Sequence, residues 1–203
     1  MTDTDPLDPQ PAPTQSAVLA LLKRPTRPHA LRNYERLLDA ARKAFAEHGA
    51  QASLEAIAKD AEVGIGTLYR NFPNRQALLE ATYAEEVATI ARAADDVADL
   101  PPGEALYAWL RKYVDYASTK KAIAEELTAA LGADSPMLTI CRTVLLDAGE
   151  PLVARAQEAG AIRDDVTFLE IARMLGALSV VRNATFQERD RLVAIALDGL
   201  RPR

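Results

Sequence analysis

Apolar residues recur at steps of three and four from residue 31 onward, a spacing that predicts amphipathic helices. The first stripe ends before Gly49, which can adopt the left-handed conformation that closes a helix. Ser53 is then expected to cap a second helix over 54–61. No run alternates at period two for long enough to demand a strand, so the pattern predicts an all-α fold. The first stripe comprises Leu31, Tyr34, Leu37, Leu38, Ala41 and Phe45.

A third predicted helix, 64–71, is short and closely bracketed. Gly64 is an acceptable N-cap, and Pro73 disfavours a helical conformation at the residue before it. Leu68 and Phe72 lie one turn apart and should face the interior. Two short helices joined by a turn of three or four residues form a helix-turn-helix, and the second helix of that motif can lie in the major groove of DNA.

The other face of the third helix holds candidate DNA contacts. Arg70 can reach guanine with two hydrogen bonds, and Asn71 can reach adenine or a phosphate. Thr67 shares their face by helical spacing. Gly66 lets the backbone come close, and Tyr69 offers its hydroxyl to a phosphate, a contact that positions a protein without reading the base sequence. The alternative for Tyr69 is an ordinary core position.

The rest of the chain also has helical periodicity. Asn74 is expected to cap a long fourth helix that reaches residue 99 and joins the helix-turn-helix to the remainder. Gly149 and Pro151 are expected to divide a later stretch, because proline fits the first turn of a new helix. The later helices are predicted at 103–119, 120–132, 136–148, 150–160, 167–184 and 187–202.

Composition narrows the function classes of this 203-residue chain. Its one cysteine, Cys141, excludes an internal disulfide, and with only two histidines, His29 and His48, it cannot build a usual zinc site. No Ser/His/Asp set, phosphate-cradling loop or metal cluster is evident, so neither an enzyme nor a bound cofactor is expected. No apolar run approaches the roughly 18 residues of a membrane span and no signal-peptide core is present, so we expect a soluble cytoplasmic protein.

The net charge of −5 conceals an uneven distribution. Residues 17–75 carry ten Lys and Arg against six Asp and Glu, whereas residues 76–203 carry fourteen against twenty. One compact basic block in an acidic chain suggests an anionic partner for that block, although chance clustering gives the same numbers. The proline-rich residues 1–16 are expected to be disordered. The basic arm at 23–32 either contacts the minor groove of DNA or belongs to a disordered tail.

The segment "VGIGTLYRNFPNRQAL", residues 63–78, matches the pattern V-x-x-G-x-L-Y-x-x-F-x-x-[KR]-x-x-L. With its flanks it resembles the N-terminal DNA-binding domain of TetR/AcrR-family transcriptional regulators. The resemblance implies a homodimer that binds a double-stranded DNA operator, and a helical C-terminal domain that binds a small molecule and controls DNA affinity. The expected division is a tail and arm at 1–28, a helix-turn-helix domain at 29–76, and a ligand-binding and dimerisation domain at 77–203.

Two positions depart from the family's usual pattern. The family often has Ser or Thr where Gly64 stands and a polar residue where Ile65 stands. Ile65 cannot donate a hydrogen bond, but it can touch a thymine methyl. For Arg75, the alternative is a solvated charge at the start of a helix. Carried over by position, the DNA contacts that the resemblance implies are Ser53, Gly64, Ile65, Gly66, Thr67, Tyr69, Arg70, Asn71 and Arg75.

Two helices of the C-terminal part carry regularly spaced aromatic and sulfur-containing side chains. Such stripes are more often ordinary core, but they can also line an apolar ligand pocket between helices. The polar candidates in such a pocket are the Trp109 N–H, the Tyr113 hydroxyl and Arg142. The expected pocket residues are Trp109, Tyr113, Tyr116, Met137, Cys141 and Leu145.

The sequence therefore predicts a dimeric DNA-binding transcriptional regulator, a repressor that a small hydrophobic ligand releases. The last two helices, within 167–200, are more apolar than one packed face needs and are expected to form a four-helix dimer interface. The alternatives are a helical dimeric interaction module and a constitutive DNA binder without ligand control. The residues leave open the ligand, the operator, and the choice between repression and activation.

Overall fold

The computed structural model describes residues 18, 24–132, 134–178, 181 and 185–202. The segment 1–16, expected to be disordered, lies outside these residues. Within the described part every regular element is helical and no strand occurs, which confirms the predicted all-α fold. The elements are α2 (Pro28–His48), η1 (Gly49–Gln51), α3 (Leu54–Asp60), α4 (Ile65–Asn71), α5 (Arg75–Arg92), η2 (Asp95–Val97), α6 (Pro102–Leu131), α7 (Pro136–Glu158), α8 (Phe168–Leu178) and α9 (Phe186–Asp198).

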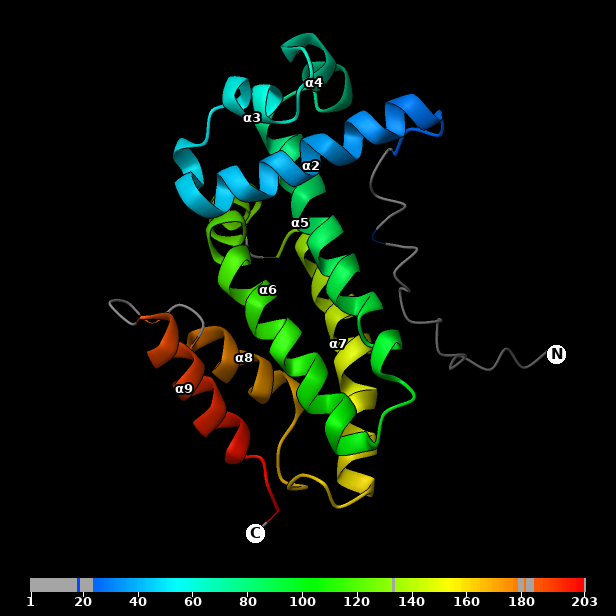
Figure 1. Cartoon of the computed structure of the whole chain (residues 1–203), viewed down its shortest axis with the longest axis vertical. Helices are drawn as coiled ribbons and strands as arrows, with labels where there is room; N and C mark the ends of the chain where they lie inside the picture. The colour runs from blue at the N-terminus through cyan, green and yellow to red at the C-terminus, as the bar shows by residue number, and fades with distance from the viewer. Residues whose placement is uncertain (1–17, 19–23, 133, 179–180, 182–184, 203) are drawn as a thin grey trace, which may run out of the picture.

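The helices form two connected parts (Figure 1). α2, α3 and α4 gather at one end, and α5 leads from them into a bundle in which α5, α6 and α7 pack against one another. α8 and α9 lie together beside this bundle, and α8 contacts both α6 and α7. α2 also contacts α6, so the two parts touch at a place other than their covalent connection through α5.

Burial confirms the inward faces predicted for the first and third helices, and the second helix buries Ile57 and Ala58. Leu68, in the middle of α4, is fully enclosed, and the rings of Tyr34 and Phe72 lie 5.0 Å apart. Leu31, at the start of the first stripe, is only half-buried. Because a helix as short as α4 is not stable alone, these core contacts hold it in place. The buried members are Tyr34, Leu37, Leu38, Ala41, Phe45, Ile57, Ala58, Ala61, Leu68 and Phe72.

Side chains close helix N-termini where the sequence predicts them. Ser53 Oγ accepts a hydrogen bond from the N–H of Ala56 at 3.3 Å, at the start of α3. Asn74 Oδ1 accepts one from the N–H of Ala77 at 2.8 Å, at the start of α5. Caps of this kind satisfy backbone N–H groups that a helix leaves unpaired and contribute about 1 kcal/mol each. α2 ends at Gly49 with a φ of 51°, the conformation that favours glycine.

The turn between α3 and α4 is closed by backbone hydrogen bonds. The N–H of Val63 donates to the carbonyl of Ala58, and the N–H of Glu62 donates to that of Lys59, both at 3.0 Å. These are the two bonds of a Schellman motif, whose left-handed position usually holds glycine. Glu62 occupies that position here, with a φ of 51°. Its carboxylate pairs with the guanidinium of Arg36 on α2, an exposed ion pair of small energetic value.

Glu62→Gly should be more stable than Glu62→Ala by about 1 kcal/mol. Both variants lose the ion pair to Arg36, but only glycine adopts a left-handed conformation without strain. Chemical denaturation of the two purified variants measures the difference in free energy of unfolding. Equal stabilities would show that the backbone conformation at this turn carries no cost.

The fourth predicted helix is shorter than expected, because α5 ends at Arg92 and not near residue 99. The indole N–H of Trp109 on α6 donates to the carbonyl of Ile90 at 2.9 Å. A continuing helix would offer that carbonyl to Ala94, whose N–H bonds to Ala91 instead, at 3.1 Å. A side chain from another helix thus takes part in ending α5, and periodicity along the chain does not reveal such a contact.

Two predicted helix breaks are wrong. α6 runs unbroken through 119–120, where the chain has neither glycine nor proline. α7 runs through both Gly149 and Pro151. A Cβ added at Gly149 would lie 2.5 Å from the ring of Phe168, so glycine is needed there for the close packing of α8 and not as a break. Buried residues lie on both sides of the proline within this one helix.

Candidate nucleic-acid interface and internal cavities

α4 lies at the outer end of the molecule, away from the α5–α9 part (Figure 1). Ile65 and Tyr69 are 38% and 46% exposed, and Arg70 is exposed as well. Tyr69 is therefore not a core residue, which removes the alternative considered for it. Leu68 is buried on the opposite face of α4. The exposed side chains therefore form an outward face on a helix that its core contacts hold in place.

Hydrogen bonds within α4 order the polar side chains of this face. Arg70 Nη2 donates to Thr67 Oγ1 at 2.9 Å, and Asn71 Nδ2 donates to the carbonyl oxygen of Thr67 at 2.8 Å. Thr67, Arg70 and Asn71 thus share one face, as their spacing predicts. Contact between these residues and DNA stays a prediction.

Both glycines at the start of α4 border open space. Apart from the adjacent residues and the backbone of its own helix, no described heavy atom lies within 4 Å of a Cβ added at Gly64 or Gly66. Gly64 has a φ of −68°, which any residue adopts. Neither the packing nor the backbone of this chain requires glycine at these two positions, so the space is free for a partner outside the chain.

The hydroxyl of Ser53 is engaged within the chain. Besides capping α3, it donates to Glu55 Oε2 at 2.8 Å. A hydrogen bond from its own backbone N–H, and then the Ser53 hydroxyl, lower the pKa of the Glu55 carboxyl. The DNA contact predicted for Ser53 would therefore have to replace a bond to an ionised carboxylate.

Arg75 connects the two parts of the molecule. Its Nε donates to Glu126 Oε1 on α6 at 2.7 Å, and its Nη2 donates to the carbonyl of Gly49 at 3.1 Å. Its Nη1 donates to the carbonyl of Ala52, and the guanidinium lies 5.1 Å from the ring centroid of Phe45. All three guanidinium nitrogens are thus bonded inside the chain, and the phosphate contact predicted for Arg75 would require these bonds to be exchanged.

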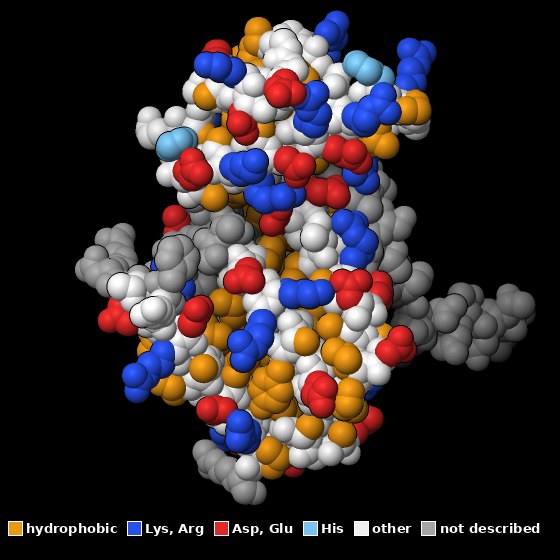
Figure 2. Space-filling model, viewed as in Figure 1, with side chains coloured by type: hydrophobic (Ala, Val, Ile, Leu, Met, Phe, Trp, Pro, Cys, Tyr) orange, Lys and Arg blue, Asp and Glu red, His pale blue; other side chains and the backbone are white. Residues whose placement is uncertain are grey.

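The positive charge of the N-terminal part does not form one uniform patch on the face in view. Figure 2 shows Lys and Arg interspersed with Asp and Glu over the α2–α4 end. Arg36 pairs with Glu62, and Arg42 with Glu86. Arg24, in the predicted basic arm, lies 3.5 Å from Glu35 and 3.8 Å from Glu85. These ion pairs neutralise part of the basic block. The exposed face of α4 is therefore a stronger candidate for the nucleic-acid interface than the basic block as a whole.

The sequence matches two family models. Residues 37–82 match the bacterial regulatory proteins of the tetR family, and residues 101–202 match the C-terminal domain of SbtR-like transcriptional regulators. The chain belongs to the TetR family. TetR-family membership makes it a DNA-binding transcriptional regulator, with a helix-turn-helix domain at the N-terminus and no enzymatic role.

Solved TetR-family structures are similar over most of the chain. The TetR regulator SCO0520 of Streptomyces coelicolor is 39% identical, covers 83% of this chain and 98% of its own, and has a TM-score of 0.71. A TetR regulator of Mycobacterium vanbaalenii is 33% identical over 88% of this chain and 100% of its own, with a TM-score of 0.65. RolR, solved with resorcinol, shares the fold at 21% identity, 85% and 89% coverage, and a TM-score of 0.51. No curated protein is significantly similar.

In this TetR-family chain a cavity of about 620 Å³ lies among α5, α6, α7 and α8. Tyr83 and Tyr113 are buried beside it, and burial raises the pKa of both phenols, which therefore stay protonated. The rings of Tyr113 and Phe168 lie 6.0 Å apart. The lining residues are Tyr83, Tyr113, Ala124, Thr128, Leu138, Arg142, Leu145, Leu146, Phe168, Leu169, Ala172 and Arg173.

The structure separates the six residues predicted to line a ligand pocket. Tyr113 and Leu145 line the 620 Å³ cavity, whereas Tyr116 lines a second cavity of about 610 Å³ among α2, α5 and α6. Trp109, Met137 and Cys141 line neither of these two cavities, nor those of about 520 and 380 Å³. Trp109 and Cys141 are fully buried, and the Trp109 N–H is bonded to Ile90. Sequence spacing missed Tyr83, Phe168 and Arg173, because they reach the cavity from helices outside the two stripes.

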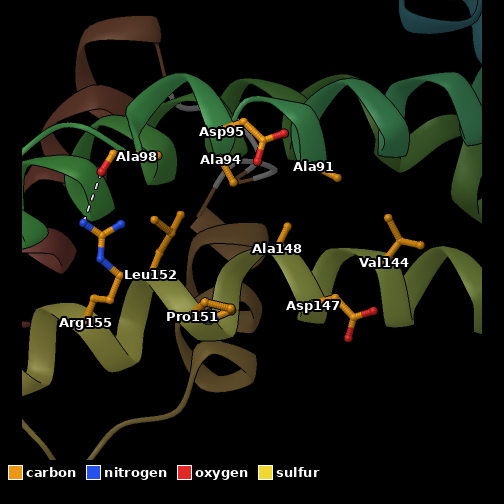
Figure 3. A pocket seen from close by; sticks show the side chains of 10 residues that line it. All are labelled: Ala91, Ala94, Asp95, Ala98, Val144, Asp147, Ala148, Pro151, Leu152 and Arg155. Carbon is orange, nitrogen blue, oxygen red and sulfur yellow. Dashed lines mark hydrogen bonds between the residues drawn. The ribbon is translucent and has the colours of Figure 1, made fainter. Parts of the chain in front are cut away.

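A third cavity, of about 520 Å³, is a groove between the end of α5 and α7 (Figure 3). Small side chains from α5 and its extension face α7 across it, with Ala91, Ala94 and Ala98 on one side. Arg155 closes one end by donating to the carbonyl of Ala98 at 3.2 Å. Asp95 and Asp147 stand at its rim.

Neither a metal centre nor a membrane span is found among the described residues. No group of three His, Cys, Asp or Glu side chains there could hold a metal ion. No helix in that part is long and apolar enough to cross a bilayer.

Proposed function

We propose that the chain is a homodimeric regulator whose two copies of α4 enter successive major grooves of a near-palindromic operator. A small apolar ligand in the 620 Å³ cavity releases it, so that it acts as a repressor in the cytoplasm. The observation that carries the proposal is the outward face of α4, where open space at Gly66 adjoins the exposed Tyr69 and Arg70. Footprinting on the DNA that flanks its own gene tests the proposal; no protected site there would contradict it.

The roles on α4 follow from chemistry and exposure. Arg70 is the base reader, because a guanidinium can donate twice to guanine. Tyr69 donates to a phosphate, and Ile65, at the start of the helix, is available to a thymine methyl. Thr67 and Asn71, bonded to each other through the Thr67 carbonyl, support this face.

Arg70→Ala should weaken operator binding by roughly 1–3 kcal/mol and relax the preference at one base pair of each half-site. Tyr69→Phe should instead weaken binding to every sequence alike, because a phosphate contact carries no sequence information. Titration of both variants against the operator and against random duplex DNA measures the two effects. Equal losses on both DNAs for Arg70→Ala would rule it out as a base reader.

Dimerisation through α8 and α9 is supported by apolar side chains that the single chain leaves uncovered. Met174 on α8 is 37% exposed, and Ile195 on α9 is 60% exposed. Two such faces packed about a twofold axis make a four-helix interface, and they would set the two α4 helices about one DNA turn, roughly 34–36 Å, apart.

Ligand control is supported by the cavity itself. Its volume of about 620 Å³ falls in the usual range of small-molecule pockets, about 300–1,000 Å³. RolR, which shares the fold, was solved with resorcinol, so a helical domain of this kind can hold a small molecule. The second candidate is a constitutive DNA binder whose C-terminal part only dimerises. A compound that binds this cavity but leaves operator affinity unchanged would favour that second candidate.

The bonds of Arg75 offer a route by which α6 and the helix-turn-helix can affect each other. We expect Arg75→Met to lower the free energy of unfolding by about 1–3 kcal/mol, because it leaves the Glu126 carboxylate and two carbonyls without their donor. A residue that only contacted phosphate would lower DNA affinity and leave the stability unchanged. Thermal or chemical denaturation, with the exposed Arg36→Met as the matched control, distinguishes the two roles.

A further inference from the structure

The 620 Å³ cavity carries a charge that its own lining does not balance. Arg142 of α7 and Arg173 of α8 line it, and no Asp or Glu does. Both arginines are exposed, so they stand at its solvent side. Neither forms an ion pair with a described residue. Glu170, one turn before Arg173 and outside the lining, has Oε2 occupied by the N–H and hydroxyl of Thr167. These bonds lower the pKa of the Glu170 carboxyl most, and the charge of Arg173 lowers it further, so Glu170 offsets part of that charge.

The other two cavities differ in this respect. In the 610 Å³ cavity, Arg42 is paired with Glu86, and Lys112 lies 3.1 Å from Asp96. The groove of Figure 3 has two aspartates and one arginine, and that arginine donates to a carbonyl. A further, smaller cavity of about 380 Å³ holds Arg163 together with Asp164 and Asp165. An excess of positive charge therefore belongs to the 620 Å³ cavity and not to these three. It occurs within residues 76–203, where acidic residues outnumber basic ones by twenty to fourteen.

Behind the two arginines the cavity is mostly apolar. Phe168 and the leucines of α7 form its walls, and burial raises the pKa of the Tyr83 and Tyr113 phenols, so both stay neutral. An apolar chamber with a cationic entrance fits a molecule that is apolar over most of its length and negatively charged at one end. Burying that end without a partner would be costly, whereas the forked guanidinium of arginine matches a carboxylate.

We propose that this cavity takes an organic carboxylate with an apolar body, the carboxylate lying between Arg142 and Arg173 and the body against Phe168. The regulatory meaning of this inference rests on the proposed ligand control, but binding itself does not. The charge of the ligand, in addition to its apolar area, then decides which molecules are bound.

Two matched pairs of probes test the inference: 2-naphthoate against 2-naphthamide, and decanoate against decanamide. In calorimetric titrations of the full chain, at least one carboxylate should bind about tenfold or more tightly than its amide, since the charged end gains hydrogen bonds that the amide does not. The double variant Arg142→Gln, Arg173→Gln should lose this preference. Arg111→Gln, an exposed arginine of α6 outside the cavity, should keep it.

Three results would overturn the inference: equal affinity of each acid and its amide, survival of the preference in the double variant, or no binding of either carboxylate at millimolar concentration. Operator binding by the ligand-free double variant is measured separately and should equal that of the parent chain. If the parent chain binds a carboxylate as described but no operator DNA, the proposed function fails while the assignment of this cavity stands.

Discussion

Ile195→Arg should give a folded monomer that binds operator DNA about a hundredfold or more weakly. Ile195 is 60% exposed on α9, so the new side chain stays out of the core of the single chain. It would, however, place an unpaired charge in the proposed interface of α8 and α9, where desolvation is costly. A monomer loses the gain of about 10²–10⁴ that comes from linking two binding modules. Sedimentation and a DNA titration measure the two quantities.

The control is Leu100→Arg, at a leucine that is 40% exposed between η2 and α6. This variant adds the same charge to a similarly exposed site and should remain dimeric with full DNA affinity. If the Ile195→Arg protein is still a dimer, the dimer interface does not include this face of α9. A monomer with unchanged operator affinity would contradict recognition of two half-sites.

Gly66→Leu should leave the fold intact and reduce operator affinity about a hundredfold or more, since a steric misfit of about 1–3 kcal/mol arises in each half-site. Beyond the adjacent residues and the backbone of α4 itself, no described atom lies within 4 Å of a Cβ at this position, so the leucine side chain starts in open space. Replacing a glycine inside a helix also favours the helix by about 0.5–1 kcal/mol. The variant should therefore be at least as stable as the parent and still bind DNA poorly.

Ala154→Leu, at an exposed position on α7, adds a similar side chain far from α4 along the chain and should change neither property. Thermal unfolding and a fluorescence-anisotropy titration with labelled operator give the two readouts. Full DNA affinity in Gly66→Leu would mean that α4 does not approach the duplex at this point.

The helix-turn-helix could be predicted from the sequence because its determinants are local. Burial at three- and four-residue steps, a serine cap at Ser53 and an asparagine cap at Asn74 all follow from neighbours in the chain. Tyr69 and Arg70 could be assigned to the outward face for the same reason, since helical geometry alone opposes them to Leu68.

The differences arise where one helix acts on another. The contact between Trp109 and Ile90 at the end of α5, and the Phe168 ring that fills the space beside Gly149, join residues 19 positions apart in both cases. Arg75 resembled a free basic residue because Glu126, its partner on α6, lies 51 positions away. No period or motif along the sequence reveals such pairings.

Contacts near both ends of α5 connect this helix to α6. Arg75, the first residue of α5, is hydrogen-bonded to Glu126, and Ile90, near the last turn of α5, is hydrogen-bonded to Trp109. Arg75 and Ile90 are separated by roughly 22 Å along the axis of α5. Because α5 is bonded to α6 near both ends, it cannot slide along α6 without breaking one of these contacts. We therefore expect α5 and α6 to move together as one rigid body. A small tilt of this helix pair at the end near Trp109 would then displace α4, at the other end, by a larger distance.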